Sequence, residues 1–354
     1  MSAYIREEAF SLVPSLETAK HWAGRKSTLE RIDRLSQHLS TRSDSSIDIL
    51  WASFGSGKTH TLRYIEHSVQ QRNERALCAF VELSESTRSF LDLYRQLSSA
   101  IDWRRIARLA QDSAVALPSD LRRAFHFIAN DDTLNASLAL DWLAGQKPDL
   151  RLLRQATNIQ RRIEADADAV AVLAAVTQML STLGGKLVIL IDEYQRITAI
   201  PQRQRTSITS TIRTLFNSCP KGLGVVFALT SALEQTALSL VPGEIRTLIG
   251  PKPSVTLPEL EAEEAAIFCV ERMRQFRPSG YNGDDYSPYG KTLLLDMISY
   301  LDKRPDVRLT PRNIIHAMSW LYDDVVDADP SQLKELKKID VGASLGALNW
   351  EASG

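Results

Sequence analysis

Cysteine is scarce in this chain. Its three cysteines, Cys78, Cys219 and Cys269, lie far apart and form no CxxC motif. Disulfide frameworks and cysteine-ligated metal centres depend on paired or closely spaced cysteines, so the sequence argues against both. We expect three buried or half-buried thiols in a reducing cytoplasm, with neither a metal nor a redox role.

Long apolar runs are also missing. The stretches at residues 169–176 and 187–191 are far shorter than the roughly 20 residues that a membrane-spanning helix needs. The opening residues, MSAYIREEAF, carry charges where a secretory signal peptide has its apolar core. The sequence therefore predicts a cytoplasmic protein without a membrane partner.

Neither sign of charge dominates. The chain has 42 lysines and arginines against 43 aspartates and glutamates, a formal net charge of −1. This balance argues against a surface coated with nucleic acid, although a local basic patch is compatible with it. There is no repeat or low-complexity tract, and 354 residues are enough for a main domain and a smaller one.

What the chain does contain is a phosphate-binding loop, ASFGSGKT, at residues 52–59. It follows a short apolar run at residues 47–51 and precedes apolar residues at helical spacing from position 62. In a strand–loop–helix context the backbone N–H groups of the loop and the positive end of the helix bind an anion together. The usual first glycine of the motif is Ala52 here, while the other key residues are present.

Each position of the loop has a predicted role. The lysine, Lys58, would reach the β- and γ-phosphates and counts among the catalytic candidates, and the hydroxyl of Thr59 would hold Mg²⁺. The candidates for nucleotide binding in this stretch are Gly55, Ser56, Gly57, Lys58, Thr59 and His60. The sequence thus predicts ATP and Mg²⁺ as cofactors. A glycine turn near a solvated lysine is the alternative.

An acidic pair provides the second half of the predicted site. Asp192 and Glu193 directly follow the apolar run at residues 187–191, which is typical of a buried strand. Ligands of open α/β sheets bind at the carboxyl ends of the strands. Asp192 would hold Mg²⁺ through its water shell, and Glu193 would orient or deprotonate the attacking water. An acidic turn after a strand is common by itself, but in this chain a phosphate loop precedes it at residues 52–59.

Three further side chains are catalytic candidates. Thr230 directly follows the apolar run at residues 225–229 and could contact the γ-phosphate or the attacking water. Ser231 is the fallback. The alternative is that Thr-Ser at the end of a strand only forms a turn. Arg312 lies in the first turn of a predicted helix, where its charge opposes the helix dipole. Arg246 could be a finger inserted into a neighbouring subunit, and Arg213 is a weaker competitor. For each arginine, an exposed surface position is the alternative.

The pattern of elements predicts an α/β fold. Strands at residues 47–51, 76–83, 187–191 and 225–229 alternate with helices, which implies a doubly wound, mainly parallel sheet. Residues 85–183 are mostly helical by pattern, and one helix face would contain Ile163, Val170, Leu173, Thr177 and Leu180.

Beyond residue 250 only helices are evident. The first begins in the acidic stretch at residues 259–264, the second contains the apolar residues of 293–301, and Thr310-Pro311 is a start signal for the third. We expect an N-terminal arm at 1–20, an α/β core at 21–250 with a helical insertion at about 85–183, a helical lid at 251–322 and a tail at 323–354.

Together these residues resemble an AAA+ P-loop ATPase. The phosphate loop, the LVILIDE strand, Thr230, Arg246 and the TPRN helix start correspond to Walker A, Walker B, sensor 1, arginine finger and sensor 2 of that family. The segment HWAGRK at residues 21–26 is similar to the adenine-side box of the origin-recognition and initiator branch, which places Gly24 and Arg25 near the base. The resemblance covers residues 20–322.

Two departures refine it. The long helical stretch before the acidic pair is an insertion, and residues 313–354 are too few for the winged-helix domain that follows the lid in initiators. The chain therefore looks closer to compact bacterial members, such as transposon-encoded target selectors and ATPases of phage-defence operons.

The resemblance implies an ATP-hydrolysing switch that assembles with itself and regulates a partner protein encoded nearby, on DNA. Arginines at 104, 105 and 108 and at 151, 154, 161 and 162 offer slight support for DNA, although such residues are often a solvated face. The alternative is a signalling or scaffold protein with little turnover and no DNA binding. A small-molecule phosphotransferase is a third, less favoured class.

Overall fold

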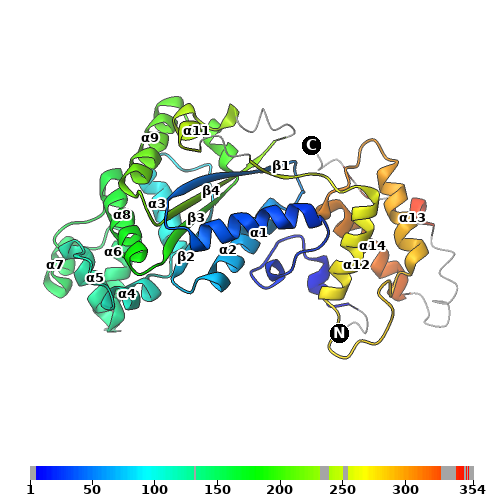
Figure 1. The fold of residues 1–354 in the computed structure, drawn as a ribbon, viewed down its shortest axis with the longest axis horizontal. Helices are drawn as coiled ribbons and strands as arrows, with labels where there is room; N and C mark the ends of the chain where they lie inside the picture. The colour runs from blue at the N-terminus through cyan, green and yellow to red at the C-terminus, as the bar shows by residue number, and fades with distance from the viewer. Residues whose placement is uncertain are drawn as a thin grey trace. The chain divides into compact units, whose positions relative to one another are not determined.

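The computed structural model describes residues 5–130, 133–231, 239–249, 254–327, 340–346, 348 and 350 (Figure 1). The chain forms two compact units. The lid unit comprises Met1–Ile32, Ala52–Tyr64 and Thr256–Gly354, and the sheet unit comprises Asp33–Trp51 and Ile65–Val255. The phosphate loop thus belongs to the lid unit, and the acidic pair belongs to the sheet unit.

A five-stranded sheet has the strand order β2-β3-β4-β1-β5. The strands are β1 (Ser46–Ala52), β2 (Ala76–Glu82), β3 (Lys186–Asp192), β4 (Leu223–Thr230) and β5 (Val255–Leu257). β2, β3 and β4 run parallel, with Glu82 opposite Asp192 and Leu187 opposite Leu223. The predicted α/β fold with a parallel sheet is confirmed, because non-sequential neighbours require helical crossovers.

The central strand β3 is buried along its whole length. Its apolar run needs cover on both faces, as expected in a parallel sheet. Within the sheet unit, helix α3 (Phe90–Ala100) packs on β2, and helix α8 (Asp166–Thr182) packs on β3 and on helix α9 (Gln202–Ser218). These helices and strands share one hydrophobic core.

The stretch between β2 and β3 is helical, as its pattern predicts. Between α3 and α8 it contains α4 (Trp103–Gln111), α5 (Ser119–Ala129), α6 (Thr133–Leu143) and α7 (Leu150–Thr157). Successive members of this group pack on one another, and Figure 1 shows them in cyan and green beyond α3 and α8.

One predicted helix boundary here is wrong. Ile163 was expected on the face of α8, but that helix begins at Asp166. The carboxylate of Asp168 accepts the backbone N–H groups of Glu164 and Ala165, which ends the loop and starts the helix at that point. Ile163 is still buried, as part of the loop that precedes the helix.

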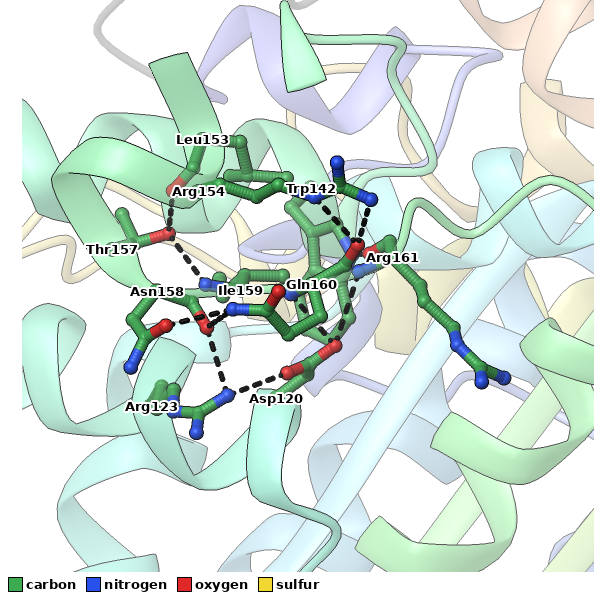
Figure 2. A network of polar contacts seen from close by, with 10 residues as sticks. All are labelled: Asp120, Arg123, Trp142, Leu153, Arg154, Thr157, Asn158, Ile159, Gln160 and Arg161. Carbon is green, nitrogen blue, oxygen red and sulfur yellow. Dashed lines mark hydrogen bonds and ion pairs between the residues drawn. The ribbon is translucent and has the colours of Figure 1, made fainter. Parts of the chain in front are cut away.

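The loop from residue 158 to 162 is fixed by side chains rather than by a strand or helix (Figure 2). Asp120 of α5 accepts the backbone N–H groups of Gln160 and Arg161 and pairs with Arg123. Trp142 of α6 donates to the carbonyl of Arg161, whose own side chain points away from the network in Figure 2. The insertion is therefore an ordered body that presents this loop at its surface.

Helices α1 (Lys26–Thr41) and α2 (Lys58–Arg72) complete the first part of the chain. Helix α2 agrees with the sequence prediction, whereas α1 and β5 were not predicted, because only helices are evident from the pattern after residue 250. Helix α11 (Gly243–Ile249) packs on α9 in the sheet unit. No helix in the described ranges is long and apolar enough to cross a membrane.

The lid unit is built from helices α12 (Ala262–Gln275), α13 (Lys291–Asp302), α14 (Pro311–Asp327) and α15 (Val341–Gly346). The predicted start of α14 is confirmed, since the Thr310 hydroxyl accepts the N–H of Asn313, 3.3 Å away.

The three buried cysteines are free thiols, and burial raises the pKa of Cys219 to about 11 and that of Cys269 to about 12.

The N-terminal segment is part of the lid core. Ile5 and Ala9 are buried among the lid helices; Ile5 precedes the short 3-10 helix η1 (Glu7–Phe10), and Ala9 is part of it. The buried guanidinium of Arg272 on α12 donates to the carbonyls of Glu8, Ala9 and Ser11 and lies over the ring of Phe276. Burial lowers the pKa of Arg272 to about 10, so it remains a cation at neutral pH.

Candidate nucleotide-binding and hydrolysis site

The phosphate loop lies between β1 and α2, and α2 begins at its lysine, Lys58. Gly55 and Gly57 have φ angles of +76° and +94°, a region that side chains other than glycine disfavour. The hydroxyls of Ser53 and Ser56 are 2.8 Å apart and close the turn from within. Lys58 is only 6% exposed. The loop is therefore already shaped as a phosphate cradle.

The start of helix α14 rests on this loop. The backbone N–H of Arg312 donates to the carbonyl of Gly55 at 3.3 Å. A Cβ placed on Gly55 would lie 3.0 Å from the Thr310 hydroxyl, so glycine is also required by the space available. The guanidinium carbon of Arg312 lies 4.5 Å from the centroid of the Phe54 ring. The structure thus brings Arg312 to the phosphate loop.

A second arginine reaches the loop from the N-terminal segment. Arg25 is 5% exposed, has a φ of +46° and donates from Nη1 to the carbonyl of Ser56 at 2.8 Å. Its Nε and Nη2 are buried without a hydrogen-bond partner among the described residues. Burial lowers the pKa of Arg25 to about 10, against the opposing effect of Glu264 and Glu259. It is therefore a cation with unused donors beside an anion-binding loop.

Gly24 is held by the lid helix α12. Its N–H donates to the carboxylate of Glu271 at 2.6 Å, and a Cβ at this position would lie 3.3 Å from Cβ of Phe268. Glu259, in the loop before α12, accepts a weak hydrogen bond from Ser53 and pairs with Arg308 at 3.3 Å. The lid, the N-terminal segment and the phosphate loop therefore form one connected set of contacts.

His60 packs on aromatic neighbours. Its ring centroid lies 6.0 Å from that of Trp22, which in turn lies 5.4 Å from Tyr64. Desolvation lowers the pKa of His60 to about 4, helped by the charge of Arg272 and opposed by hydrogen bonds to the backbone of Thr18 and His21. His60 is therefore neutral at pH 7. Neither Trp22, which is part of the HWAGRK segment at residues 21–26, nor Tyr64 is among the residues predicted to bind the nucleotide.

The acidic pair lies at the end of β3 in the sheet unit. Asp192 is 1% exposed, and its carboxylate accepts the backbone N–H of Glu193 at 2.8 Å. Glu193 has φ +53° and ψ +34°, a left-handed conformation that is uncommon for a residue with a side chain. The carboxylate of Asp192 thus stabilises a turn that sets the backbone position of the glutamate.

A glutamine links Glu193 to Thr230. The Gln195 amide donates from Nε2 to Oε2 of Glu193 at 2.6 Å, and its Oε1 accepts the backbone N–H of Thr230 at 3.0 Å. The Thr230 hydroxyl is buried and has no hydrogen-bond partner among the described residues. The structure thus brings two predicted residues together through a third that the sequence analysis did not find. Ser231, the predicted fallback, is buried next in the chain.

The remaining arginine candidates are exposed. Arg246 lies on α11 and Arg213 on α9, two helices that pack on each other. The Arg246 guanidinium makes no hydrogen bond or ion pair within the parts of the chain that the structure describes. Neither arginine makes a hydrogen bond or ion pair with Glu193 or Thr230 within those parts.

The predicted magnesium ligands are hard oxygens, which suit the ion. Mg²⁺ is usually held by one or two carboxylates, waters and substrate phosphates rather than by a full protein cage. The buried carboxylate of Asp192 in the sheet unit and the hydroxyl of Thr59 in the lid unit are donors of this kind.

More than half of the chain matches a known domain family. A model of the AAA domain matches residues 41–236, which include the phosphate loop, the acidic pair and Thr230. The chain belongs to the AAA domain family. The chain therefore has the AAA fold of a nucleotide-binding protein, with its phosphate loop at residues 52–59. No curated protein is significantly similar in sequence.

Solved structures agree on the AAA fold. The ORC1 protein of Aeropyrum pernix, solved in complex with DNA, is 12% identical, with a TM-score of 0.51, over 95% of this chain and 70% of that one. The ORC2 protein of the same organism, in ADPNP and ADP complexes, is 12% identical, with a TM-score of 0.56, over 98% and 76%. Cdc6p of Pyrobaculum aerophilum is 14% identical, with a TM-score of 0.52, over 90% and 65%. The predicted resemblance to origin-recognition ATPases is confirmed at the level of the fold.

Proposed function

We propose that this protein binds ATP with Mg²⁺, hydrolyses it to ADP and phosphate, and uses the bound nucleotide to switch its assembly with itself. The observation that carries the proposal is the pairing of Glu193 and Thr230 through one glutamine at the ends of β3 and β4. A carboxylate and a hydroxyl at neighbouring strand ends are the groups needed to orient an attacking water.

The binding half of the proposal rests on the phosphate loop. Its N–H groups, the Lys58 ammonium and the unused donors of Arg25 would bind the phosphates, while Trp22 and His60 offer an aromatic wall for the base. Arg312, which already lies over Phe54 at the loop, would neutralise the γ-phosphate. Mg²⁺, when bound by Thr59 and Asp192, would neutralise charge that develops on the phosphate oxygens.

The hydrolytic half assigns the proton transfer. In the proposed reaction Glu193 accepts a proton from water as the water oxygen forms a bond to the γ-phosphorus and the bond to the ADP oxygen breaks. Thr230 would hold the same water or a γ-phosphate oxygen through its unpartnered hydroxyl. The burial of this hydroxyl and the link of Thr230 to Glu193 through Gln195 support this role.

Self-assembly and DNA binding are further parts of the proposal. The exposed guanidinium of Arg246 fits a finger that reads the nucleotide of a neighbouring copy. The insertion presents exposed arginines at positions 104, 108, 151, 154 and 161, and Arg161 points away from its own network in Figure 2. Exposed arginines of this kind can contact a phosphate backbone. A DNA-bound switch would act on a partner protein encoded nearby.

The decisive experiment compares the wild type with Glu193→Gln in phosphate release from Mg-ATP. We expect the wild type to release phosphate and the variant to bind ATP equally well but turn over at least about 100-fold more slowly. The variant should also form a stable ATP-bound oligomer in light scattering, whereas Arg246→Ala should not assemble and Arg213→Ala should.

Two outcomes would change this proposal. If the wild type binds ATP but releases no phosphate, and Glu193→Gln behaves identically, the protein is a nucleotide-binding scaffold. If no DNA is bound at low salt with ATP, ADP or no nucleotide, the DNA part is wrong.

A further inference from the structure

The amide of Gln195 has a defined orientation. A backbone N–H can only donate, so the N–H of Thr230 identifies the amide atom facing it as Oε1. Nε2 must then face Oε2 of Glu193, where it donates at 2.6 Å. Both polar atoms of this half-buried side chain are therefore used, one on each predicted catalytic residue.

The short helix that carries Gln195 is firmly attached to the sheet. It is η3 (Tyr194–Ala199), and the Tyr194 ring packs on Phe227 of β4 with centroids 4.2 Å apart. Arg196 donates to the carbonyl of Leu83 and pairs with Glu82 at 2.8 Å, both at the end of β2. Gln195 is therefore placed by contacts to β2 and β4 on either side of β3, not by a mobile loop.

The carboxylate of Glu193 is held through one oxygen. Oε2 receives the Gln195 amide, and Nε of Arg196 lies 4.0 Å from the same atom. Oε1 has no hydrogen bond to the described residues. A carboxylate fixed in this way presents one oxygen in a set direction, which is what a base needs to accept a proton from a bound water.

We propose that Gln195 is a positioning residue that sets the carboxylate of Glu193 and couples it to the end of β4 at Thr230. A shift of Thr230, for example when its hydroxyl binds a phosphate oxygen, would be passed through the amide to the catalytic carboxylate. The inference rests on the proposed hydrolysis, because the glutamine acts only through Glu193.

The test uses three substitutions of the full chain. Gln195→Met keeps the length and packing but removes both hydrogen bonds, and Gln195→Ala also removes the packing. Gln195→Glu keeps the acceptor for Thr230 but can donate to Glu193 only when the new carboxyl is protonated. Gln178→Glu, at an exposed position on α8, is the matched control for the added charge.

We expect Gln195→Met and Gln195→Ala to lower kcat for phosphate release about 10- to 100-fold while the Kd for ATP stays within about twofold. Gln195→Glu should be as slow at pH 8 and should regain activity relative to the wild type as the pH falls towards 6, because a protonated carboxyl restores the donor. A purely structural role would move the thermal midpoint and the Kd and would give no such pH dependence.

The outcomes separate two failures. Phosphate release by the wild type with unchanged kcat in Gln195→Met overturns the inference alone. A Gln195→Glu profile parallel to that of Gln178→Glu does the same. No phosphate release by the wild type overturns the proposed hydrolysis, and the positioning role falls with it.

Discussion

The guanidinium of Arg312 lies over the ring of Phe54, with 4.5 Å between its central carbon and the ring centroid. Arg312 lies in the first turn of the lid helix α14, and Phe54 is an exposed side chain of the phosphate loop. A planar cation on an aromatic face is stabilised while its N–H groups remain able to bind phosphate. The lid arginine is therefore held at the loop before any nucleotide binds.

Replacing Arg312 by alanine should slow phosphate release about 10- to 1,000-fold and weaken ATP binding less, because its charge matters most when the γ-phosphate is transferred. Arg312→Lys should recover little of the lost activity, since an ammonium group cannot stack flat on the Phe54 ring or bind a phosphate through two parallel hydrogen bonds. Steady-state phosphate release and ATP titration calorimetry measure both effects. Phe54→Ala, which keeps the charge and removes the stacking, should lie much closer to the wild type. Equal losses in both variants would contradict the assignment.

Gly55→Ala should abolish ATP binding and destabilise the lid unit. The substitution combines an unfavourable φ of +76° with a Cβ only 3.0 Å from the Thr310 hydroxyl. Gly280→Ala is the matched control, because its φ is +81° and nothing lies within 4 Å of the added atom. The control should lose only the backbone term of about 1 kcal/mol in urea unfolding. If Gly55→Ala is as stable as Gly280→Ala, the start of helix α14 at Thr310 must move to make room for the added methyl group.

Arg25 should be required for nucleotide binding. Its unused Nε and Nη2 donors gain partners when phosphate binds, so ATP should raise the thermal midpoint of the wild type much more than that of Arg25→Met. Methionine keeps the apolar stem and removes the donors. We expect the Kd for ATP to rise at least about 10-fold, the range of one charged hydrogen bond. An unchanged Kd would show that Arg25 does not bind ATP and serves only through its hydrogen bond to Ser56.

His60 should make the folded state sensitive to acid. Its pKa is about 4 in the folded protein and about 6.5 in the unfolded chain. The unfolded state therefore binds the proton first, so the stability that is complete above pH 6.5 is lost as the pH falls towards 4. The loss is at most about 3 kcal/mol, at 1.36 kcal/mol per pKa unit. Urea unfolding of the wild type and of His60→Phe at pH 7.5 and pH 5 measures it.

The control for His60 is His126→Gln, at an exposed position on α5. The difference in unfolding free energy between the two pH values should shrink in His60→Phe and stay as in the wild type in His126→Gln. If His60→Phe keeps the full acid sensitivity, other groups are responsible for it.

The strands that carry the site were predictable because they are buried on both faces. The run at residues 187–191 had to be a central strand, and Asp192 had to emerge at its carboxyl end. The phosphate loop and the Thr310 cap were also predictable, because each depends on residue types that few other structures require.

Features that depend on packing escaped the sequence analysis. β5 has only three residues, Val255–Leu257, which is too short for a periodic pattern, and its identity as a strand comes from its neighbour in the sheet. Helix α1 does have apolar residues at helical spacing, including Ile32, Leu35 and Leu39, so residues 26–41 do contain a sequence signal for it. Gln195 has no sequence signal, because a glutamine after an acidic pair is ordinary until its two hydrogen bonds are seen.

Arg272 binds the N-terminal segment only through main-chain carbonyls, at residues 8, 9 and 11. Every amino acid has such a carbonyl, so these hydrogen bonds place almost no demand on the identity of the residues they hold. The arm can therefore change its sequence freely at Glu8 and Ser11 while keeping its place, whereas a change at Arg272 itself releases all three attachments at once. Three polar attachments of this segment thus depend on one side chain that lies more than 260 residues away along the chain, while the buried Ile5 and Ala9 add apolar contacts to the lid core.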